Sequence, residues 1–421
     1  MMTRYLRLAH YLLIISLAGC SSLAPLLTTP TTVPVITVTA TPQLDPTPTT
    51  SVQTTGNILR VWLPPQFDPS AETESSGLLN QRLKAFEAGH SEIRVEVRIK
   101  DGATDIVDVM SVTNRAAPTT MPDLIALSYS QMQEAASAGF LHPLDGLTDI
   151  LQGPDWYVFA RELSSVQNTQ YGIPFAADAM MVVYRSSVFE TPPSDWDSIF
   201  NSGTQMVFSL SESQSFFPLS LYLSANGQLV DEQGAFTLEE DVLVDVLSHY
   251  QRAYEAGAIP LSYKEIQSDA KALEYYRNGD SDISVIWASS DIKVNSGAYT
   301  ALLGLDDVPD SIGDGWVWAL AGPSAENLPL AVELASHLVE SEYMAEWTQA
   351  SGYLPTRPLA LGVWENETIQ EEVDNVLLAS HPIPSADAIS MFGPLIHGAL
   401  IRIFNGEQAE VVARSVIENL K

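Results

Sequence analysis

Between residues 58 and 139, the spacing of apolar residues changes back and forth between the period of a strand and the period of a helix. Residues 58–63 (ILRVWL) and 123–127 (DLIAL) are short apolar runs of the kind that form buried strands, and residues 93–99 (IRVEVRI) alternate with the period of a strand. Residues 79–86 place apolar side chains at helical spacing ahead of a glycine, and residues 130–139 predict a second helix closed by a glycine. This order predicts a parallel sheet with helices on its faces.

The pattern restarts after residues 171–185 (YGIPFAADAMMVVYR). Thr237 and Glu240 predict a capping box at the start of a helix, and Pro329 suits the first turn of another. Residues 283–287 (ISVIW) predict a strand, and the last 35 or so residues are mostly helical in pattern. No internal repeat relates the two parts, so we expect two α/β units that are not recent copies.

The N-terminus has the layout of a secretory signal. Arg4 and Arg7 precede a short apolar segment that ends in small residues, which is too short for a spanning helix. Residues 17–20 (LAGC) resemble a bacterial lipobox, which implies that Cys20 becomes the first mature residue and carries a lipid. We therefore predict a signal peptide at 1–19 and lipidation of Cys20; the alternative is a cleaved signal with an incidental cysteine.

The segment that follows predicts a tether rather than a domain. Of the 35 residues from 21 to 55, 12 are threonine, 6 are proline, and Asp45 is the only charged one. Such a segment has too few large apolar groups to bury a core. In an extended polyproline conformation of ~3.1 Å per residue it would reach about 100 Å. Residues 20–55 are thus expected to link a membrane anchor to the body.

Composition narrows the function classes. The body from residue 56 onward has 366 residues and no cysteine, so we expect two domains without a disulfide framework or thiolate metal site. The formal net charge of −32 repels phosphate backbones, which argues against a nucleic-acid partner. No histidine pair has metal-ligand spacing, and no phosphate-binding, dinucleotide-binding or hydrolase motif is present. We expect no enzyme activity, no metal and no cofactor.

A series of segments in order resembles the family 1 extracellular solute-binding proteins of ABC transporters, the sugar-binding, maltose-binding-protein-like group. The segments are VWLP, KAFEAGHSEIRVEVRI, PDLIAL, AGFLHPLDGL, YGIPFAADAMMVVYR, PPSDWDSI, YRNGDSDISVIWASS, GDGWVWALAGPSAENLPLAVELASHL and GYLPTRP. Together they span almost the whole body.

The resemblance implies a two-lobed, type II periplasmic-binding-protein-like α/β fold. Each lobe would hold a mostly parallel sheet flanked by helices, with the ligand cleft between the lobes. The N-terminal lobe would comprise residues 56–178 and 314–350, and the C-terminal lobe residues 179–313 and 351–421. Ligand would bridge both lobes and shift the population toward a closed state that a membrane permease recognises.

A sugar cleft needs aromatic platforms for CH faces and polar side chains for hydroxyl groups. Trp287 ends a strand, while Trp316 and Trp318 follow the turn at Asp314-Gly315. Asp178 follows a strand-like segment, where its carboxylate could accept two hydroxyls. The other candidates are Gln66 and Phe67 after the first strand, Tyr129 at the end of DLIALSY, and Arg357, which could equally form a salt bridge between the lobes.

These inferences predict a monomeric solute-binding lipoprotein on the extracytoplasmic face of the cell membrane. It would capture a mono- or oligosaccharide for the permease subunits of an ABC importer. Three alternatives remain open: the same fold with another small solute such as a polyamine, a ligand sensor subunit, and an extracellular hydrolase.

Overall fold

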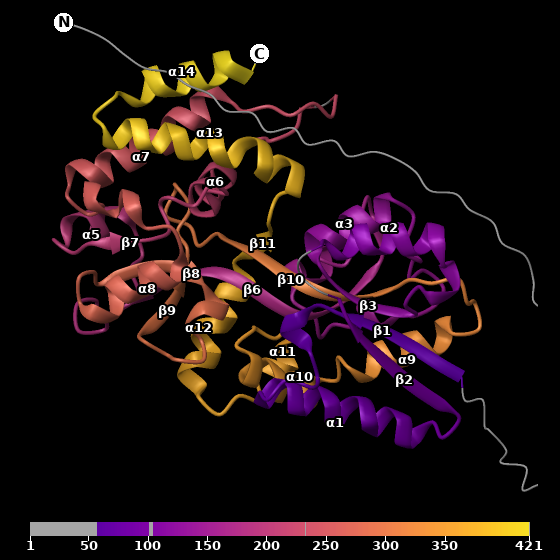
Figure 1. Ribbon diagram of the computed structural model, residues 1–421. Coiled ribbons are helices and arrows are strands. Elements are labelled where there is room, and N and C mark those ends of the chain that lie inside the picture. Colours follow the sequence, from indigo (N-terminus) through magenta and orange to yellow (C-terminus); the bar gives the residue numbers. More distant parts are fainter. Residues whose placement is uncertain (1–56, 101–103, 232, 421) are drawn as a thin grey trace, which may run out of the picture. The chain divides into compact units, whose positions relative to one another are not determined.

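The computed structural model describes residues 57–100, 104–231 and 233–420 (Figure 1). The predicted signal peptide, Cys20 and the tether lie outside these residues. The strands are β1 (Asn57–Leu63), β2 (Ile93–Ile99), β3 (Leu124–Ser128), β4 (Ser165–Val166), β5 (Thr169–Gln170), β6 (Gly172–Tyr184), β7 (Met206–Val207), β8 (Ile283–Trp287), β9 (Ala298–Ala301), β10 (Ser311–Leu320) and β11 (Ser380–Pro382).

The helices alternate with these strands and continue to the C-terminus. They are α1 (Glu74–Gly89), α2 (Ile106–Ala116), α3 (Tyr129–Ser137), α4 (Val158–Glu162), α5 (Trp196–Asn201), α6 (Phe216–Ser224), α7 (Glu240–Glu255), α8 (Asp269–Asn278), α9 (Leu328–His337), α10 (Ser341–Ser351), α11 (Pro358–Leu361), α12 (Glu367–Leu378), α13 (Ala386–Phe404) and α14 (Ala409–Leu420). Short 3₁₀ turns include η1 (Pro65–Phe67) and η5 (Ala288–Ser290).

The first half confirms the predicted order of strands and helices. β1 pairs in parallel with both β2 and β3, and the chain passes through α1 and α2 between these strands. In Figure 1, α2 and α3 lie on one side of this sheet and α1 and α10 on the other. Buried residues on both sides form its core, among them Trp62, Leu83, Met110 and Leu124.

Two long antiparallel strands connect the halves of the sheet. The order along the sheet is β2-β1-β3-β10-β6-β8-β7, with β11 on β10 and β9 on β6. β6 pairs with β10 as far as Ala179, and from Met180 onward it pairs with β8. The α/β architecture is therefore confirmed, but the nine-stranded sheet is mixed: β1 with β2 and β3, and β7 with β8, pair in parallel, whereas β10 pairs antiparallel with β3 and β6, and β6 antiparallel with β8 and β9.

The second half is built on β7, β8 and β9. α8 packs on β8, and α7 packs against α6, α13 and α14. Among the described residues, α13 is the one helix whose length and composition would let it cross a membrane, but half of its apolar stretch is buried. Its buried residues contact α6, α7 and α14, so α13 serves as a core helix here.

The predicted capping box at α7 is wrong. Glu239, not Thr237, is the N-cap residue, and no side chain of its own caps the helix. Instead, the backbone N–H of Glu239 donates to the Tyr222 hydroxyl at 2.7 Å, and the Glu239 carboxylate accepts from the Gln228 amide at 3.0 Å. The Thr237 amide donates to the Leu229 carbonyl, so that residue belongs to the preceding turn.

Candidate functional site

Two carboxyl groups lie side by side where β6 and β10 cross from one half to the other. Asp178 on β6 stands directly opposite Asp314 on β10, and directly opposed residues of an antiparallel pair project from the same face. The Asp178 carboxylate accepts from the Ser289 amide at 3.0 Å and from the Ser289 hydroxyl. Asp314 accepts from the Gly315 amide at 2.7 Å.

Burial dominates the electrostatics of both groups. It raises the pKa of Asp178 to about 7, against the opposing effect of the Ser289 hydrogen bonds and with a further increase from the Asp314 and Asp269 charges. Burial also raises the pKa of Asp314 to about 6, although its bond from Gly315 lowers it. Near neutral pH the pair is thus poised between protonated and ionised states.

An aromatic group lies next to the carboxyl pair. Trp316, half-buried, pairs with Ala176, which puts it on the same face of the sheet as Asp178. The Phe67 ring meets Trp316 edge-on at 5.0 Å between centroids and lies 5.8 Å from the Tyr353 ring. Burial, together with the charges of Asp178 and Asp314, raises the pKa of Tyr353 to about 12. Tyr353 therefore lies close enough to feel both carboxylates.

A further aromatic pair, Trp287 and Phe216, lies at the C-terminal end of β8 in the second half. Trp287, also half-buried, pairs with Met180 of β6 and meets Phe216 edge-on at 5.3 Å. Its backbone N–H donates to Asp269 at 2.7 Å, which fixes the strand end. Because Ser289 follows two residues later and binds Asp178, the β8 end is tied to the strand crossing.

The structure brings most of the sequence-predicted residues to this crossing. Trp316 and Asp178 form its centre, and Phe67 supports Trp316 from η1 while only 4% exposed. Gln66, beside it, is exposed. Tyr129 at the start of α3 is near enough that the Asp314 charge contributes to its raised pKa, after burial and the Glu162 charge.

Trp318 is a core residue, although the regular pairing of β10 with β3 keeps it on the same face of β10 as Trp316. The β6–β10 register shifts between Trp316 and Val317, so Trp318 lies opposite Ile173 and stacks on Phe175 at 4.5 Å. Its side chain is 3% exposed. The extra residue of this bulge is Phe175 on β6, whose ring covers Trp318, and the sequence pattern does not reveal it.

Arg357 forms an ion pair and hydrogen bonds within the protein. Its Nε donates to Asp155 at 2.7 Å and its guanidinium also donates to the Val339 carbonyl at 2.7 Å. The geometry favours the salt-bridge interpretation of this residue over direct ligand contact.

Gly315 also has a structural explanation. A Cβ there would meet the Ala176 carbonyl oxygen at 2.7 Å and Leu163 at 2.8 Å. The glycine therefore permits close packing behind the sheet, on the side away from Trp316, instead of an approach by ligand.

The sequence did not single out Ser289, Tyr353 or Phe216 as residues of the site. It also did not indicate that the Asp314 carboxyl group belongs to the site. The sequence places Asp314 only at the turn before Trp316. Its position opposite Asp178 depends on strand register between segments far apart in the chain. Tyr353 lies in the segment GYLPTRP, and its place in that segment is the signal by which the sequence could have identified it as a site residue.

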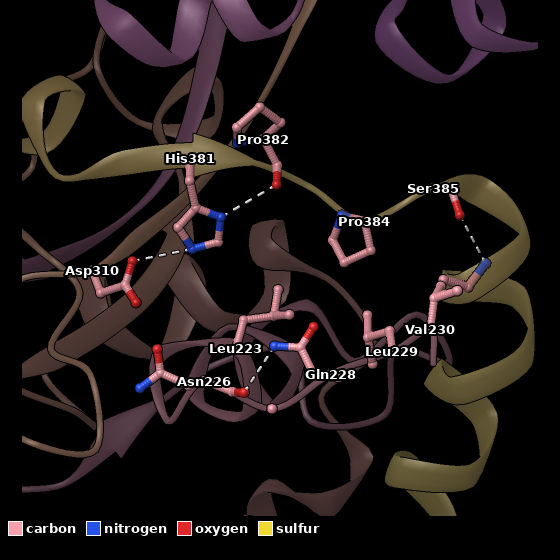
Figure 2. A pocket seen from close by; sticks show the side chains of 12 residues that line it. Leu223, Asn226, Gln228, Leu229, Val230, Asp310, His381, Pro382, Pro384 and Ser385 are labelled. Carbon is pink, nitrogen blue, oxygen red and sulfur yellow. Dashed lines mark hydrogen bonds and ion pairs between the residues drawn. The ribbon is translucent and has the colours of Figure 1, made fainter. Parts of the chain in front are cut away.

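A separate cavity of about 510 Å³ lies between the α6–α7 connection and the start of α13 (Figure 2). His381 faces Asp310 there at 3.1 Å, and the Gln228 side chain donates to the Asn226 carbonyl. Because these polar groups already satisfy one another and none of the predicted ligand residues lines the cavity, we place the candidate site at the strand crossing. Within the described ranges, no cluster of His, Cys, Asp or Glu is arranged to hold a metal ion.

Comparison with known proteins agrees with this fold. The family model of bacterial extracellular solute-binding proteins matches residues 81–373. None of the curated proteins matches the chain.

Solved structures that resemble the chain include several sugar-binding proteins. A cyclo/maltodextrin-binding protein complexed with maltotetraose has a TM-score of 0.70 at 16% identity, covering 86% of this chain and 96% of that one. The sugar-binding protein MalE from Xanthomonas citri has a TM-score of 0.70 at 15% identity, with 86% and 96% covered. Maltose-bound MalE3 of T. maritima has a TM-score of 0.63 at 18% identity, with 86% and 98% covered. At these identities the likeness establishes the two-lobed fold.

Proposed function

Since the chain belongs to the family of bacterial extracellular solute-binding proteins, we propose that it captures a mono- or oligosaccharide for an ABC importer. The observation that carries the proposal is the grouping of half-buried Trp316, Tyr353 and Trp287 around carboxyl groups at the strand crossing. Aromatic faces and hydrogen-bonding carboxylates together match the two kinds of surface that a sugar presents.

The proposed mechanism is closure of two lobes around the solute. β6 and β10 belong to both halves, and Ser289 from the β8 side already reaches Asp178. A sugar stacked on Trp316 and bonded to the β8 end would bridge the halves and favour the closed state. We assign residues 56–178 and 314–350 to one lobe and 179–313 and 351–421 to the other.

Membrane attachment and delivery complete the proposal. Lipidated Cys20 would hold the protein at the extracytoplasmic face, residues 21–55 would give it reach, and permease subunits would receive the solute. A sensor role with the same solute would leave uptake unchanged when the gene is deleted, whereas an importer subunit would abolish it.

A thermal-shift screen of the purified chain against saccharides tests solute capture. A ligand that binds the native state alone stabilises it by RT ln(1 + [L]/Kd), which is ~2.7 kcal/mol at a hundredfold excess over Kd. We expect a raised melting temperature with at least one saccharide. A flat response across mono- and oligosaccharides, with a response to another solute class, would reject the saccharide proposal while leaving the family assignment intact.

A further inference from the structure

The two carboxyl groups at the strand crossing have no counter-ion. Among the residues that the structure describes, no Lys, Arg or His forms an ion pair with Asp178 or Asp314. The charges that act on Asp178 are those of Asp314 and Asp269, both acidic. The groups around the pair are Ser289 of η5, Tyr353 before α11, Tyr129 of α3 with Glu162 of α4 nearby, and Asp269 of α8.

Two other aspartates have a basic partner, and buried Asp123 instead accepts from the Arg60 backbone N–H at 2.8 Å and from the Asn327 side chain at 2.9 Å. Asp291, whose side chain is fully buried, pairs with Arg277. Asp155 pairs with Arg357 at 2.7 Å, with 13% of its side chain exposed. Burying an ionised carboxylate is costly unless a partner compensates for the lost hydration. Asp178 and Asp314 differ from these in that they form a directly opposed pair of carboxyl groups, whose charge a cationic solute would compensate.

We propose that the solute carries a protonated amine, which Asp178 and Asp314 bind together. The inference rests on the proposed function, because the site is the same and only the chemistry of the solute is specified further. An amine between two carboxylates gains charge-assisted hydrogen bonds, and the half-buried faces of Trp316 and Tyr353 beside it suit a cation as well as a sugar ring.

The same chemistry could come from two sources, an amino-substituted saccharide or a polyamine. The aromatic platforms favour the amino saccharide, since a ring with CH faces can stack on Trp316 while its amine reaches the carboxyl pair. The net charge of −32 adds a field that attracts cations to the protein as a whole.

The inference also fixes the direction of the pH dependence. Burial raises the pKa of Asp178 to about 7 and of Asp314 to about 6. A protonated amine binds the ionised pair, so its affinity should increase as the pH rises from 5 to 8, as long as the amine keeps its proton. A neutral sugar of the same skeleton gains only the stronger hydroxyl–carboxylate hydrogen bonds from ionisation of the pair, so its affinity should increase less over this range.

Isothermal titration of the purified full chain with matched disaccharides tests the inference. The probes are chitobiose, with two free amines, N,N′-diacetylchitobiose, which keeps the skeleton without the charge, and cellobiose; spermidine serves as the polyamine. We expect chitobiose to bind at least ~10-fold more tightly than the diacetyl form at pH 7.5, because only its protonated amine can form charge-assisted hydrogen bonds with the two carboxylates.

Variants distinguish the effect of the carboxyl pair on binding from the effect of the net charge of the protein. Asp314→Asn and Asp178→Asn should reduce the preference for chitobiose to about threefold or less, because one carboxylate of the pair is lost. Asp145→Asn removes an exposed acid of equal charge and should leave the preference unchanged. Melting curves of each variant verify that it is folded before titration.

The outcomes distinguish this inference from the proposed function. If cellobiose or the diacetyl form binds as tightly as chitobiose, the amine inference fails and saccharide capture stands. If spermidine binds and no saccharide does, saccharide capture fails and the amine inference stands. If neither chitobiose nor spermidine binds the wild-type chain, or if the preference survives both asparagine variants, the amine inference is overturned.

Discussion

The Trp316 ring stands edge-on to Phe67, with an angle of 88° between the planes and 5.0 Å between the centroids. Phe67 is buried and also meets Phe175 and Trp347, whereas Trp316 is half-buried. The core of the first half therefore extends through Phe67 to hold one tryptophan at its surface. This arrangement positions Trp316 as a rigid platform.

Trp316→Ala should lose affinity more than stability. We expect removal of one stacking platform to cost about 1.5–3 kcal/mol of binding, or roughly 10- to 150-fold in Kd. Titration with the saccharide identified in the thermal-shift screen measures it. The matched control is Trp318→Ala, which empties a core position and should cost about 3–5 kcal/mol of unfolding free energy. Equal destabilisation by both variants with unchanged binding in Trp316→Ala would remove Trp316 from the site.

The carboxyl pair should make the empty protein less stable as the pH rises. Asp178 and Asp314 have folded pKa values of about 7 and 6, raised from the ordinary 3.8. Between pH 4 and 7 the folded state therefore holds protons that the unfolded chain releases, and the unfolding free energy falls with increasing pH. Asp314→Asn should flatten this decline and melt higher than the wild type at pH 8. Denaturant titrations at pH 5 and 8 check it; a steeper decline in the variant would contradict the assignment.

Arg357→Ala should destabilise the fold while sparing the solute. Its guanidinium bonds Asp155 and the Val339 carbonyl, and its side chain is 19% exposed. Loss of a buried pair's partner typically costs about 3–5 kcal/mol, and this partly exposed pair should cost about 1–3 kcal/mol. Chemical denaturation measures the change in unfolding free energy. We expect the saccharide Kd of the variant to stay within about threefold of the wild-type value, a shift of under 1 kcal/mol. A large loss of affinity without loss of stability would restore Arg357 as a ligand contact.

Cys20→Ser should release the protein from membranes. The expected reason is that serine has no thiol for attachment of the diacylglycerol, so the membrane loses its hold on the tether. Fractionation of cells followed by immunodetection measures the distribution, and the saccharide affinity of the released protein should equal that of the wild type. Retention of the serine variant in the membrane fraction would show that Cys20 is not the anchor.

The sequence was sufficient for the elements whose signals are local. β1, β3 and β8 are short apolar runs, and all three are strands in the structure. Pro329 lies in the first turn of α9 as predicted. Local patterns also placed Asp178 and Trp316 near the strand crossing, since both lie beside segments whose order resembles a known family.

The features that the sequence could not supply depend on contacts between distant segments. The N–H of the α7 N-cap residue, Glu239, donates to the Tyr222 hydroxyl, and the pairing of Asp178 with Asp314 depends on the register of β6 against β10. Trp316 and Trp318 share a face of β10, but the bulge on β6 places Phe175 over Trp318 and buries it. Register and bulges are set by packing on both faces of a sheet, which a periodic pattern in one strand does not record.

A crystal structure of the chain with the saccharide that raises its melting temperature most tests the central claim directly. We predict density for a sugar ring on Trp316, with a polar group of the sugar within hydrogen-bond distance of Asp178 or Asp314 and a contact from the Trp287–Ser289 end. Density for the sugar in the His381 cavity of Figure 2, with the strand crossing empty, would contradict the account.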